Sequence, residues 1–260
     1  DLFETGYLAQ ELDLQNRERQ KLTREMQQAA DLLADPSSGL IFAVSPDFNQ
    51  GVVGLVASRL SESHYRPSVI GQQMEDFTRA SCRSIPEFHI TRALDECADL
   101  MERHGGHAAA AGFTIRNERV AELRQRLEAI ARRELDGLDL RPLLRADMEV
   151  TFSQLNKDLL NDLALLQPTG EGNRDASFIS RNALVLGKRL MGSEKNHLRL
   201  TLKQDDLVID AVGFNKGELA DSLTDRVDLL YHFELNDFNG RQSLQLRLRD
   251  VRPAGSRDEG

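Results

Sequence analysis

The sequence has only two cysteines, no apolar run long enough to cross a membrane and no excess of positive charge. Cys82 and Cys97 lack the paired spacing of a zinc site and are too few for a disulfide framework, so we expect free thiols in a reducing cytoplasm. The first residues, Asp1-Leu2-Phe3-Glu4, do not resemble a signal peptide. The formal net charge of -9 argues against a generally basic protein, although a local basic track is compatible with it.

The sequence does contain enough apolar residues to bury a core, with 40% hydrophobic and 29% charged residues in a chain of 260. That length fits one large domain or two of ordinary size. No glycine or proline occurs between Tyr7 and Pro36, and apolar residues recur at helical spacing towards the end of this segment. The pattern predicts one long helix or two joined helices over residues 2–35, with a dense polar surface.

Residues 37–135 alternate short apolar segments with amphipathic ones, which predicts an α/β domain. Strands are expected at 40–45, 67–71, 78–83 and 109–115, and helices at 49–64, 90–103 and 117–135. Asn117 is the expected N-cap of the last helix. Residues 136–177 are interpreted as a linker followed by a strand at 148–152 and a helix at 155–166.

Residues 178–254 are predicted to be mainly β. Strands are expected at 178–191, 195–203, 206–214, 226–236 and 241–250, with a short helical insert at 216–222. Leucines alternate with polar residues, which gives one buried and one wet face, and Asn239-Gly240 is a strong signal for a tight hairpin. Five strands with one insert fit a small Greek-key barrel of the OB type.

Basic residues occur where OB barrels bind their ligands, on the second and third strands and on the flanking loops 192–196 and 236–241. The candidate nucleic-acid-binding residues are Lys188, Arg189, Lys195, Asn196, Arg199, Lys203, Phe238 and Arg241. An aromatic ring such as that of Phe238 can stack on a base, which contributes roughly 1–3 kcal/mol. Two alternatives stay open, because arginines on a wet strand face are ordinary surface residues and OB barrels also bind proteins and sugars.

The most unusual stretch is 103–113, Arg-His-Gly-Gly-His-Ala-Ala-Ala-Ala-Gly-Phe. Glycines let backbone N–H groups approach a ligand, and beside histidine and arginine such groups form an anion-binding concavity. The same residues also fit a structure without a ligand, in which a helix ends at Gly105 through a left-handed cap and a strand of small residues follows. Composition alone leaves both open.

Five stretches, in order along the chain, resemble one family: 12–23, 49–60, 81–85, 105–112 and 168–173. They resemble the RecJ-type single-strand-specific exonucleases of the DHH phosphoesterase superfamily, and the resemblance covers nearly the whole chain. It implies a connector helix over 1–36, a DHH-associated α/β domain over 37–135 that helps to hold nucleic acid at a metal site, and an OB-type domain over 178–254 that binds the single strand.

In relatives, an arginine-serine pair and a glycine-glycine-histidine motif engage a terminal phosphate. The resemblance therefore implies that phosphate is bound by Asn49, Arg83, Ser84, Gly105, Gly106 and His107, and His107 is also the candidate catalytic residue. A guanidinium makes paired, charge-assisted contacts to phosphate. The family usually has glycine where this chain has Cys82, so a side chain stands beside Arg83 at a point where backbone approach is expected.

The six histidines occur in no Asp-His-His or His-x-Asp motif. Two-metal phosphodiester hydrolysis needs a cluster of carboxylates and histidines that holds two ions about 4 Å apart. The resemblance therefore implies that Mn or Mg is bound in the parent enzyme by a domain absent from this chain, and that the chain binds none. We expect the substrate-binding part of a metal-dependent 5′-to-3′ exonuclease for single-stranded DNA, used in DNA repair and recombination and inactive by itself.

Two other interpretations are compatible with the resemblance. The parent could be a non-catalytic replication scaffold, which an upstream sequence without Asp-His-His would favour. A small-nucleotide or oligoribonucleotide phosphatase of the same superfamily fits less well, because a short substrate needs no OB-type domain. The expected partner is single-stranded DNA, with no membrane. The residues alone, without the resemblance, do not determine the metal, the digestion polarity or the oligomeric state. They also leave open whether a single-strand-binding protein or a helicase is a further partner.

Overall fold

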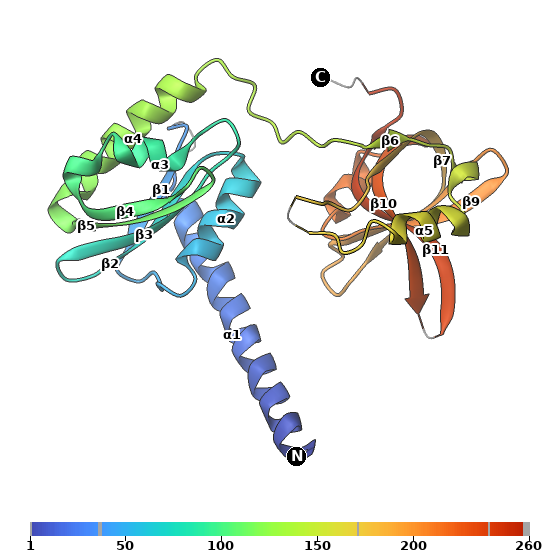
Figure 1. Cartoon of the computed structure of the whole chain (residues 1–260), viewed down its shortest axis with the longest axis horizontal. Helices are drawn as coiled ribbons and strands as arrows, with labels where there is room; N and C mark the ends of the chain where they lie inside the picture. The colour runs from blue at the N-terminus through green and yellow to red at the C-terminus, as the bar shows by residue number, and fades with distance from the viewer. Residues whose placement is uncertain (1, 36–37, 171, 239, 257–260) are drawn as a thin grey trace. The chain divides into compact units, whose positions relative to one another are not determined.

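The computed structural model describes residues 2–35, 38–170, 172–238 and 240–256, with the side chains of residues 2–4, 238 and 241 outside this description. The chain divides into two compact units, Asp1–Pro142 and Leu143–Gly260 (Figure 1). Separate hydrophobic clusters form within each unit. Within the described residues, no helix combines the length and apolar character needed to cross a membrane.

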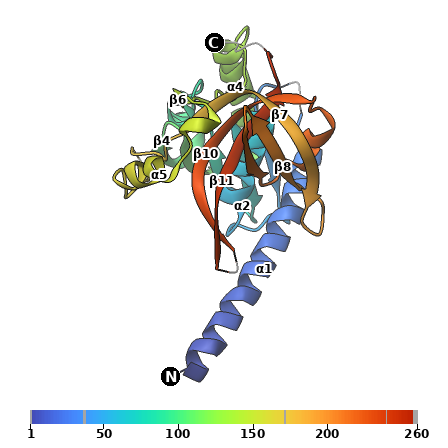
Figure 2. The same cartoon turned by 90° about the vertical axis from the view of Figure 1, so that its right-hand side faces the viewer.

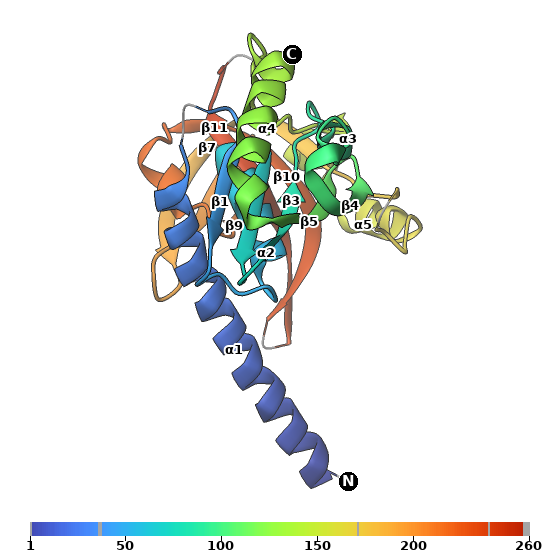
Figure 3. The same ribbon diagram turned by 90° about the vertical axis from the view of Figure 1, so that its left-hand side faces the viewer.

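The first unit begins with a single helix, α1 (Leu2–Leu33). The side chains described from Thr5 to Leu22 are all exposed, and this part of the helix projects from the rest of its unit in Figures 1 and 3. Further along, Met26 and Ala30 are buried at helical spacing and pack in one cluster with residues of α2 (Val53–His64). Only the end of α1 therefore contributes to the core.

The sheet of the first unit has five strands in the spatial order β1-β2-β3-β5-β4. Their bounds are β1 (Ile41–Ser45), β2 (Ser68–Gln73), β3 (Phe77–Arg83), β4 (Met101–His107) and β5 (Ala110–Arg116). The pair β1–β2 is parallel and the other pairs are antiparallel. Helix α2 packs on one face, whereas α3 (Ile90–Asp95) and α4 (Val120–Leu135) cover the other (Figure 3).

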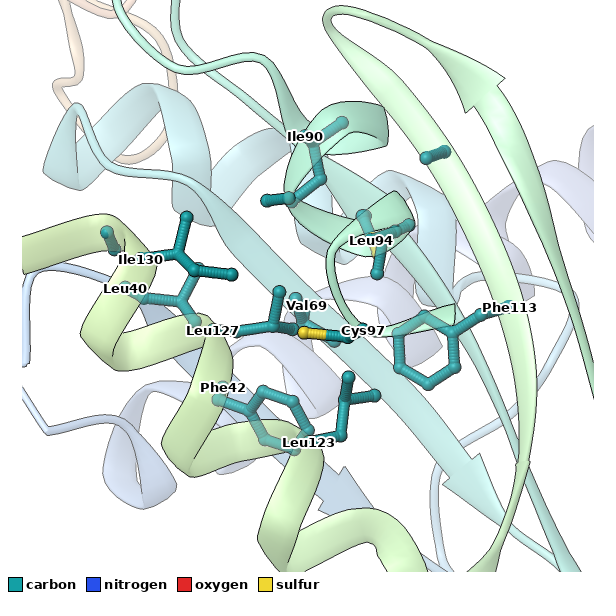
Figure 4. Close-up of a cluster of buried hydrophobic side chains, with 14 of the residues drawn as sticks. Leu40, Phe42, Val69, Ile90, Leu94, Cys97, Phe113, Leu123, Leu127 and Ile130 are labelled. Atoms are coloured by element: carbon teal, nitrogen blue, oxygen red, sulfur yellow. The ribbon is translucent and has the colours of Figure 1, made fainter. Parts of the chain in front are cut away.

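Side chains along β3 and β5 alternate between the two faces of the sheet. Phe113 points into the core beneath α3 and α4, where Leu94, Leu123 and Leu127 are fully buried (Figure 4). Cys82 belongs to the same buried cluster. Burial of one such leucine contributes about 1.5–3 kcal/mol. Because successive residues of a strand face opposite ways, the residues between these core positions lie on the α2 side of the sheet.

The predicted helix over 90–103 is wrong. Helix α3 ends at Asp95, a 3-10 turn follows at Ala98–Leu100, and Met101 begins β4. The apolar spacing behind the prediction is real, since Leu94, Cys97 and Leu100 are all buried, but two short turns place them in the core. Gly105 therefore lies within a strand, which excludes the alternative of a helix cap at this glycine.

Asn117 is not the N-cap of α4. It begins a 3-10 turn, Asn117–Arg119, that precedes the helix. Its side chain accepts a hydrogen bond from the Thr78 hydroxyl at 2.8 Å and donates to the carbonyls of Met74 at 2.8 Å and Glu75 at 3.0 Å. The asparagine thus joins the end of β5 to the turn between β2 and β3.

The second unit is a closed five-stranded barrel. Strands β7 (Phe178–Met191), β8 (His197–Gln204), β9 (Leu207–Gly213), β11 (Arg241–Pro253) and β10 (Arg226–Phe238) are neighbours in that order, and β10 also pairs with β7 (Figure 2). Only β9 and β11 pair in parallel among these five described strands. The predicted OB-type barrel is confirmed, with its helical insert at Gly217–Asp221 and with its last two strands longer than predicted.

Residues that precede the barrel pack onto it. The short strand β6 (Met148–Glu149) pairs in parallel with β7, and Phe152 and Leu155 are buried in the barrel core. The predicted strand over 148–152 is therefore too long. The predicted helix over 155–166 is also too long, because α5 (Lys157–Ala164) begins after Asn156, whose side chain caps it by accepting a hydrogen bond from the backbone N–H of Leu159 at 2.9 Å.

One buried polar network lies inside the barrel. The Tyr231 hydroxyl and Ser180 Oγ are 2.6 Å apart, and Ser180 Oγ donates to the carbonyl of Val150 at 2.7 Å. Both side chains are fully buried, and burial raises the pKa of Tyr231 to about 12. The network joins β10, β7 and the segment before the barrel through groups that all have partners.

Candidate functional site

Three rows of residues cross the sheet of the first unit on its α2 side, and together they form what we call the β3–β5–β4 face. In strand order the rows are Arg83–Ala110–His107, Ser81–Gly112–Gly105 and Arg79–Thr114–Arg103. The nine positions share one side, because the intervening residues of β3 and β5 point into the opposite core. Small residues occupy the middle of the face and basic residues its margins.

Arg83 ends β3 beside the first turn of α2. Its Nη1 donates to the carbonyl of Cys82 at 2.8 Å, and its Nη2 would lie 3.2 Å from a Cβ built on Gly54. Within the described residues, no carboxylate forms an ion pair with Arg83. The first turn of α2 has no acidic residue and no side-chain cap. The N–H of Val53 donates to the Asn49 carbonyl, and the N–H groups that follow it favour an anion, as the guanidinium does.

Ser81 shares the face with Arg83, whereas Ser84 has another role. The Ser84 hydroxyl donates to the carbonyl of Phe88 at 2.7 Å and its N–H donates to the carbonyl of Ala109 at 2.9 Å. Both groups of Ser84 therefore hold the loop that follows β3. Alternation along a strand is the signal that could have found Ser81, because residues 81 and 83 face the same way.

Asn49 and Cys82 both affect the shape of this region without standing on the face. The Asn49 side chain accepts a hydrogen bond from the N–H of Gly51 at 2.8 Å, and its carbonyl accepts from Val52 and Val53. This exposed asparagine therefore forms the turn that begins α2. Cys82 is fully buried, and burial raises the pKa of its thiol to about 12. Its side chain enters the opposite core, so the departure from the family's glycine leaves the β3–β5–β4 face unchanged.

The glycine-glycine-histidine motif forms the end of β4. A Cβ on Gly105 would meet no atom within 4 Å, whereas one on Gly106, which has a φ of +150°, would lie 2.3 Å from the carbonyl oxygen of Ala110. The side chain of His107 is exposed, and the His107 carbonyl accepts a hydrogen bond from Thr91 at 2.7 Å. His107 and Arg83 are two strands apart in one row, a separation of about 10 Å, so they flank a common space.

A groove of about 410 Å³ continues this space along the strands. Gly105 and Gly112 face each other in its floor, and Arg79, Arg103 and other polar residues line it. Neither aspartate nor glutamate is among its described lining residues. The face and the groove together suit a negatively charged ligand.

The barrel has a larger groove of about 790 Å³ on its outer surface. Lys188, Arg189 and Arg199 line it together with Asp210, which accepts hydrogen bonds from Arg199 and Thr201, both at 2.8 Å. Burial alone would raise the pKa of Asp210, but these two hydrogen bonds outweigh it and the pKa lies below its ordinary value. The charge of Arg199 is therefore partly neutralised.

The other candidate residues of the barrel are spread more widely. Lys203 lines a separate cavity of about 520 Å³ with Arg181 and Arg226. Lys195 and Asn196 lie in the loop between β7 and β8, and the Asn196 carbonyl accepts a hydrogen bond from the N–H of Gly217 at 2.9 Å. The side chains of Phe238 and Arg241 lie outside the described residues. The structure thus joins Lys188, Arg189 and Arg199 and separates Lys203 from them.

Metal ligands were not expected in this chain. Among the described residues, no three histidine, cysteine, aspartate or glutamate side chains are grouped so that they could hold a metal ion. His64 and His104 each contact a single carboxylate, Asp31 at 2.7 Å and Asp95 at 2.8 Å. These donor sets do not fit a two-metal centre.

Comparison with known proteins identifies both units. Residues 37–133 match the DHHA1 domain and residues 146–250 match the RecJ OB domain. The single-stranded-DNA-specific exonuclease RecJ of Bacillus subtilis (strain 168) is 33% identical over 259 residues, which cover 96% of this chain and 33% of that protein. RecJ of Haemophilus influenzae is 29% identical over 262 residues, 95% of this chain and 45% of that protein.

A solved structure supports the same relationship. RecJ from Thermus thermophilus in complex with Mn²⁺ superimposes with a TM-score of 0.79 and 29% identity, over 95% of this chain and 36% of that one. The chain spans between about a third and a half of the length of the curated relatives that it matches. The chain therefore contains a DHHA1 domain followed by a RecJ OB domain, and over most of its length it is homologous to the part of RecJ exonucleases that contains these two domains.

Proposed function

We propose that this chain is the DNA-binding part of a metal-dependent exonuclease that degrades single-stranded DNA from its 5′ end, in DNA repair and recombination in the cytoplasm. The observation that supports it is the shared face of Ser81, Arg83 and His107 beside the start of α2, with no carboxylate paired to Arg83 in the described part of the chain. This arrangement suits the terminal phosphate of a strand.

Each group on the face has a distinct task in this proposal. The Arg83 guanidinium offers two parallel, charge-assisted hydrogen bonds to phosphate oxygens, and the Ser81 hydroxyl adds a third donor. The N–H groups of the first turn of α2 favour the same negative charge. His107, across the small side chain of Ala110, donates to the phosphate or to the scissile oxygen beside it.

The barrel binds the nucleotides that follow. Arg189 and Arg199 contact their phosphates in the groove on the outer surface, in a manner that does not depend on the bases. In the parent enzyme Mn or Mg supplies the chemistry of hydrolysis, by activating water and stabilising charge on the phosphate. The residues of this chain bind and orient the strand.

The test measures binding of fluorescent oligothymidylates, with a 5′-phosphate or a 5′-hydroxyl, by anisotropy. We expect the chain to prefer the phosphorylated end and Arg83→Gln to remove that preference. Arg132→Gln, an exposed arginine on α4 at the opposite side of the sheet, is the matched control and leaves the preference intact. Equal losses for both oligonucleotides in Arg83→Gln would contradict the proposed role of this face.

The second measurement concerns hydrolysis. Incubation of the chain with single-stranded DNA and Mn²⁺ is expected to yield no mononucleotides, because the described residues lack a cluster of metal donors. Digestion that chelation stops would show that the chain contains its own metal centre, and our division of tasks between binding and catalysis would be wrong.

A further inference from the structure

We infer that Arg79 and Arg103 form a second phosphate position, which binds a phosphodiester inside the strand while Arg83 binds the terminal phosphate. The inference rests on the proposed function, since it names a further contact of the same face with single-stranded DNA. It assigns a role to two arginines that neither the family motifs nor the charge pattern of the barrel singled out.

The distance along the strands separates the two positions. Arg79 precedes Arg83 by four residues of β3, and Arg103 precedes His107 by four residues of β4. Four residues of extended strand span about 13 Å. The guanidinium of Arg83 is held at its own end of the face, where it donates to the Cys82 carbonyl and lies beside Gly54. We therefore assign Arg79 and Arg103 to a different phosphate from Arg83.

The side chains at this end are available for a ligand. Arg79 is exposed, and its side chain has no hydrogen-bond or ion-pair partner within the described residues. Arg103 donates from Nε to the Thr114 hydroxyl at 3.2 Å, which orients its guanidinium without neutralising it. Arg116, two residues after Thr114 on β5, is not available in the same way. Its guanidinium pairs with Glu102 at 3.1 Å and lies over the ring of Phe77 at 5.0 Å.

The floor of the groove connects the two positions. Gly105 and Gly112 are paired in the row between them and present only backbone, and the position of a Cβ on Gly105 is open. A sugar-phosphate chain can therefore pass close to the sheet between the two pairs of basic side chains. The groove is lined by Arg79, Arg103, Gly105, Gly112 and Thr114 on this path.

The ligand chemistry follows from these groups. Two guanidinium groups favour a phosphodiester with its single negative charge. Two rings are among the described lining residues, Phe113 and His104. Phe113 is 5% exposed and belongs to the opposite core, and His104 Nε2 lies 2.8 Å from Asp95 Oδ1 of α3, on that same side of the sheet. The site therefore offers no ring on which a base can stack, and we expect it to contact the backbone of the strand.

The test is a thermodynamic cycle on a 5′-phosphorylated tetrathymidylate. Its internal linkages are neutralised one at a time as methylphosphonates, and each oligonucleotide is titrated with the wild type, Arg79→Gln, Arg103→Gln and the control Arg132→Gln. We expect each groove variant to weaken binding of the unmodified oligonucleotide roughly threefold to fivefold and to lower its salt slope by about 0.7. One methylphosphonate position should abolish the effect of both variants.

Thymidine 5′-monophosphate separates this inference from the proposed function. Its affinity should fall in Arg83→Gln and stay unchanged in Arg79→Gln and Arg103→Gln. If Arg83→Gln behaves as expected while the two groove variants lose affinity equally at every methylphosphonate position, or lose none, the second phosphate position is refuted and the proposed function stands. If Arg83→Gln leaves binding of the monophosphate unchanged, the proposed function is refuted, and so is the inference that rests on it.

Discussion

Two adjacent glycines of β4 should respond to alanine in opposite ways. At position 106 a Cβ would lie 2.3 Å from one backbone atom and 2.5 Å from another, at a φ of +150°. Backbone strain in such a region costs about 1–3 kcal/mol, and the contact adds to it because neither neighbour is a flexible side chain. We expect Gly106→Ala to lower the free energy of unfolding of the first unit by about 3 kcal/mol, equivalent to roughly 6–12 °C in Tm.

Gly105→Ala is the matched control, because its Cβ would enter open space over the groove. We expect stability to be unchanged or to rise by about 0.5–1 kcal/mol, since alanine suits a strand interior better than glycine, while affinity for short 5′-phosphorylated DNA falls severalfold. The sequence has no tryptophan, so thermal unfolding is followed by far-ultraviolet circular dichroism. A wild-type Tm for Gly106→Ala, or equal losses of stability in both variants, would refute the assignment of the two glycines to opposite faces.

Three further predictions concern the second unit. Ser180→Ala leaves the buried Tyr231 hydroxyl without its partner and should lower the free energy of unfolding by about 1–3 kcal/mol; a Tm within about 1 °C of the wild type would contradict this. Hydrogen bonds from the backbone N–H and the hydroxyl of Ser177 lower the pKa of Asp147. Its stabilisation is therefore present above the ordinary aspartate pKa of about 4 and is lost as pH falls through the lower folded value. The Tm difference between the wild type and Asp147→Asn should accordingly hold above about pH 4, shrink as pH falls further and disappear only below the lower folded pKa. Asp210→Asn frees Arg199 from its carboxylate and should raise affinity for single-stranded DNA severalfold, whereas weaker binding would place that arginine outside the interface.

Much of the fold follows from local patterns. Alternating leucines on β8 and β11 placed these strands correctly, because a half-buried strand has a period of two. The same method failed at residues 90–103, where Leu94, Cys97 and Leu100 kept a helical spacing although the chain turns between them. The end of that segment is a strand because β4 pairs with β5, and pairing between distant residues leaves no local signal in the sequence.

The arrangement of the candidate site could be predicted from the sequence only in part, for the same reason. Arg83 and His107 are 24 positions apart, and only the register of three strands places them in one row. The motif named the serine at position 84, whereas the strand period brings Ser81 to the face. The pairing of Arg199 with Asp210 depends on the register of β8 and β9, which the charge pattern of either strand alone does not show.

The bare floor between Gly105 and Gly112 has a consequence for how a strand could move. An enzyme that shortens DNA one nucleotide at a time meets a different base after each cut, and a pocket shaped to one base would stall at the next. Backbone, guanidinium and hydroxyl groups meet the repeating part of the polymer, which is identical at every step. A face of this composition would let the DNA strand advance at an even pace, whatever its base sequence.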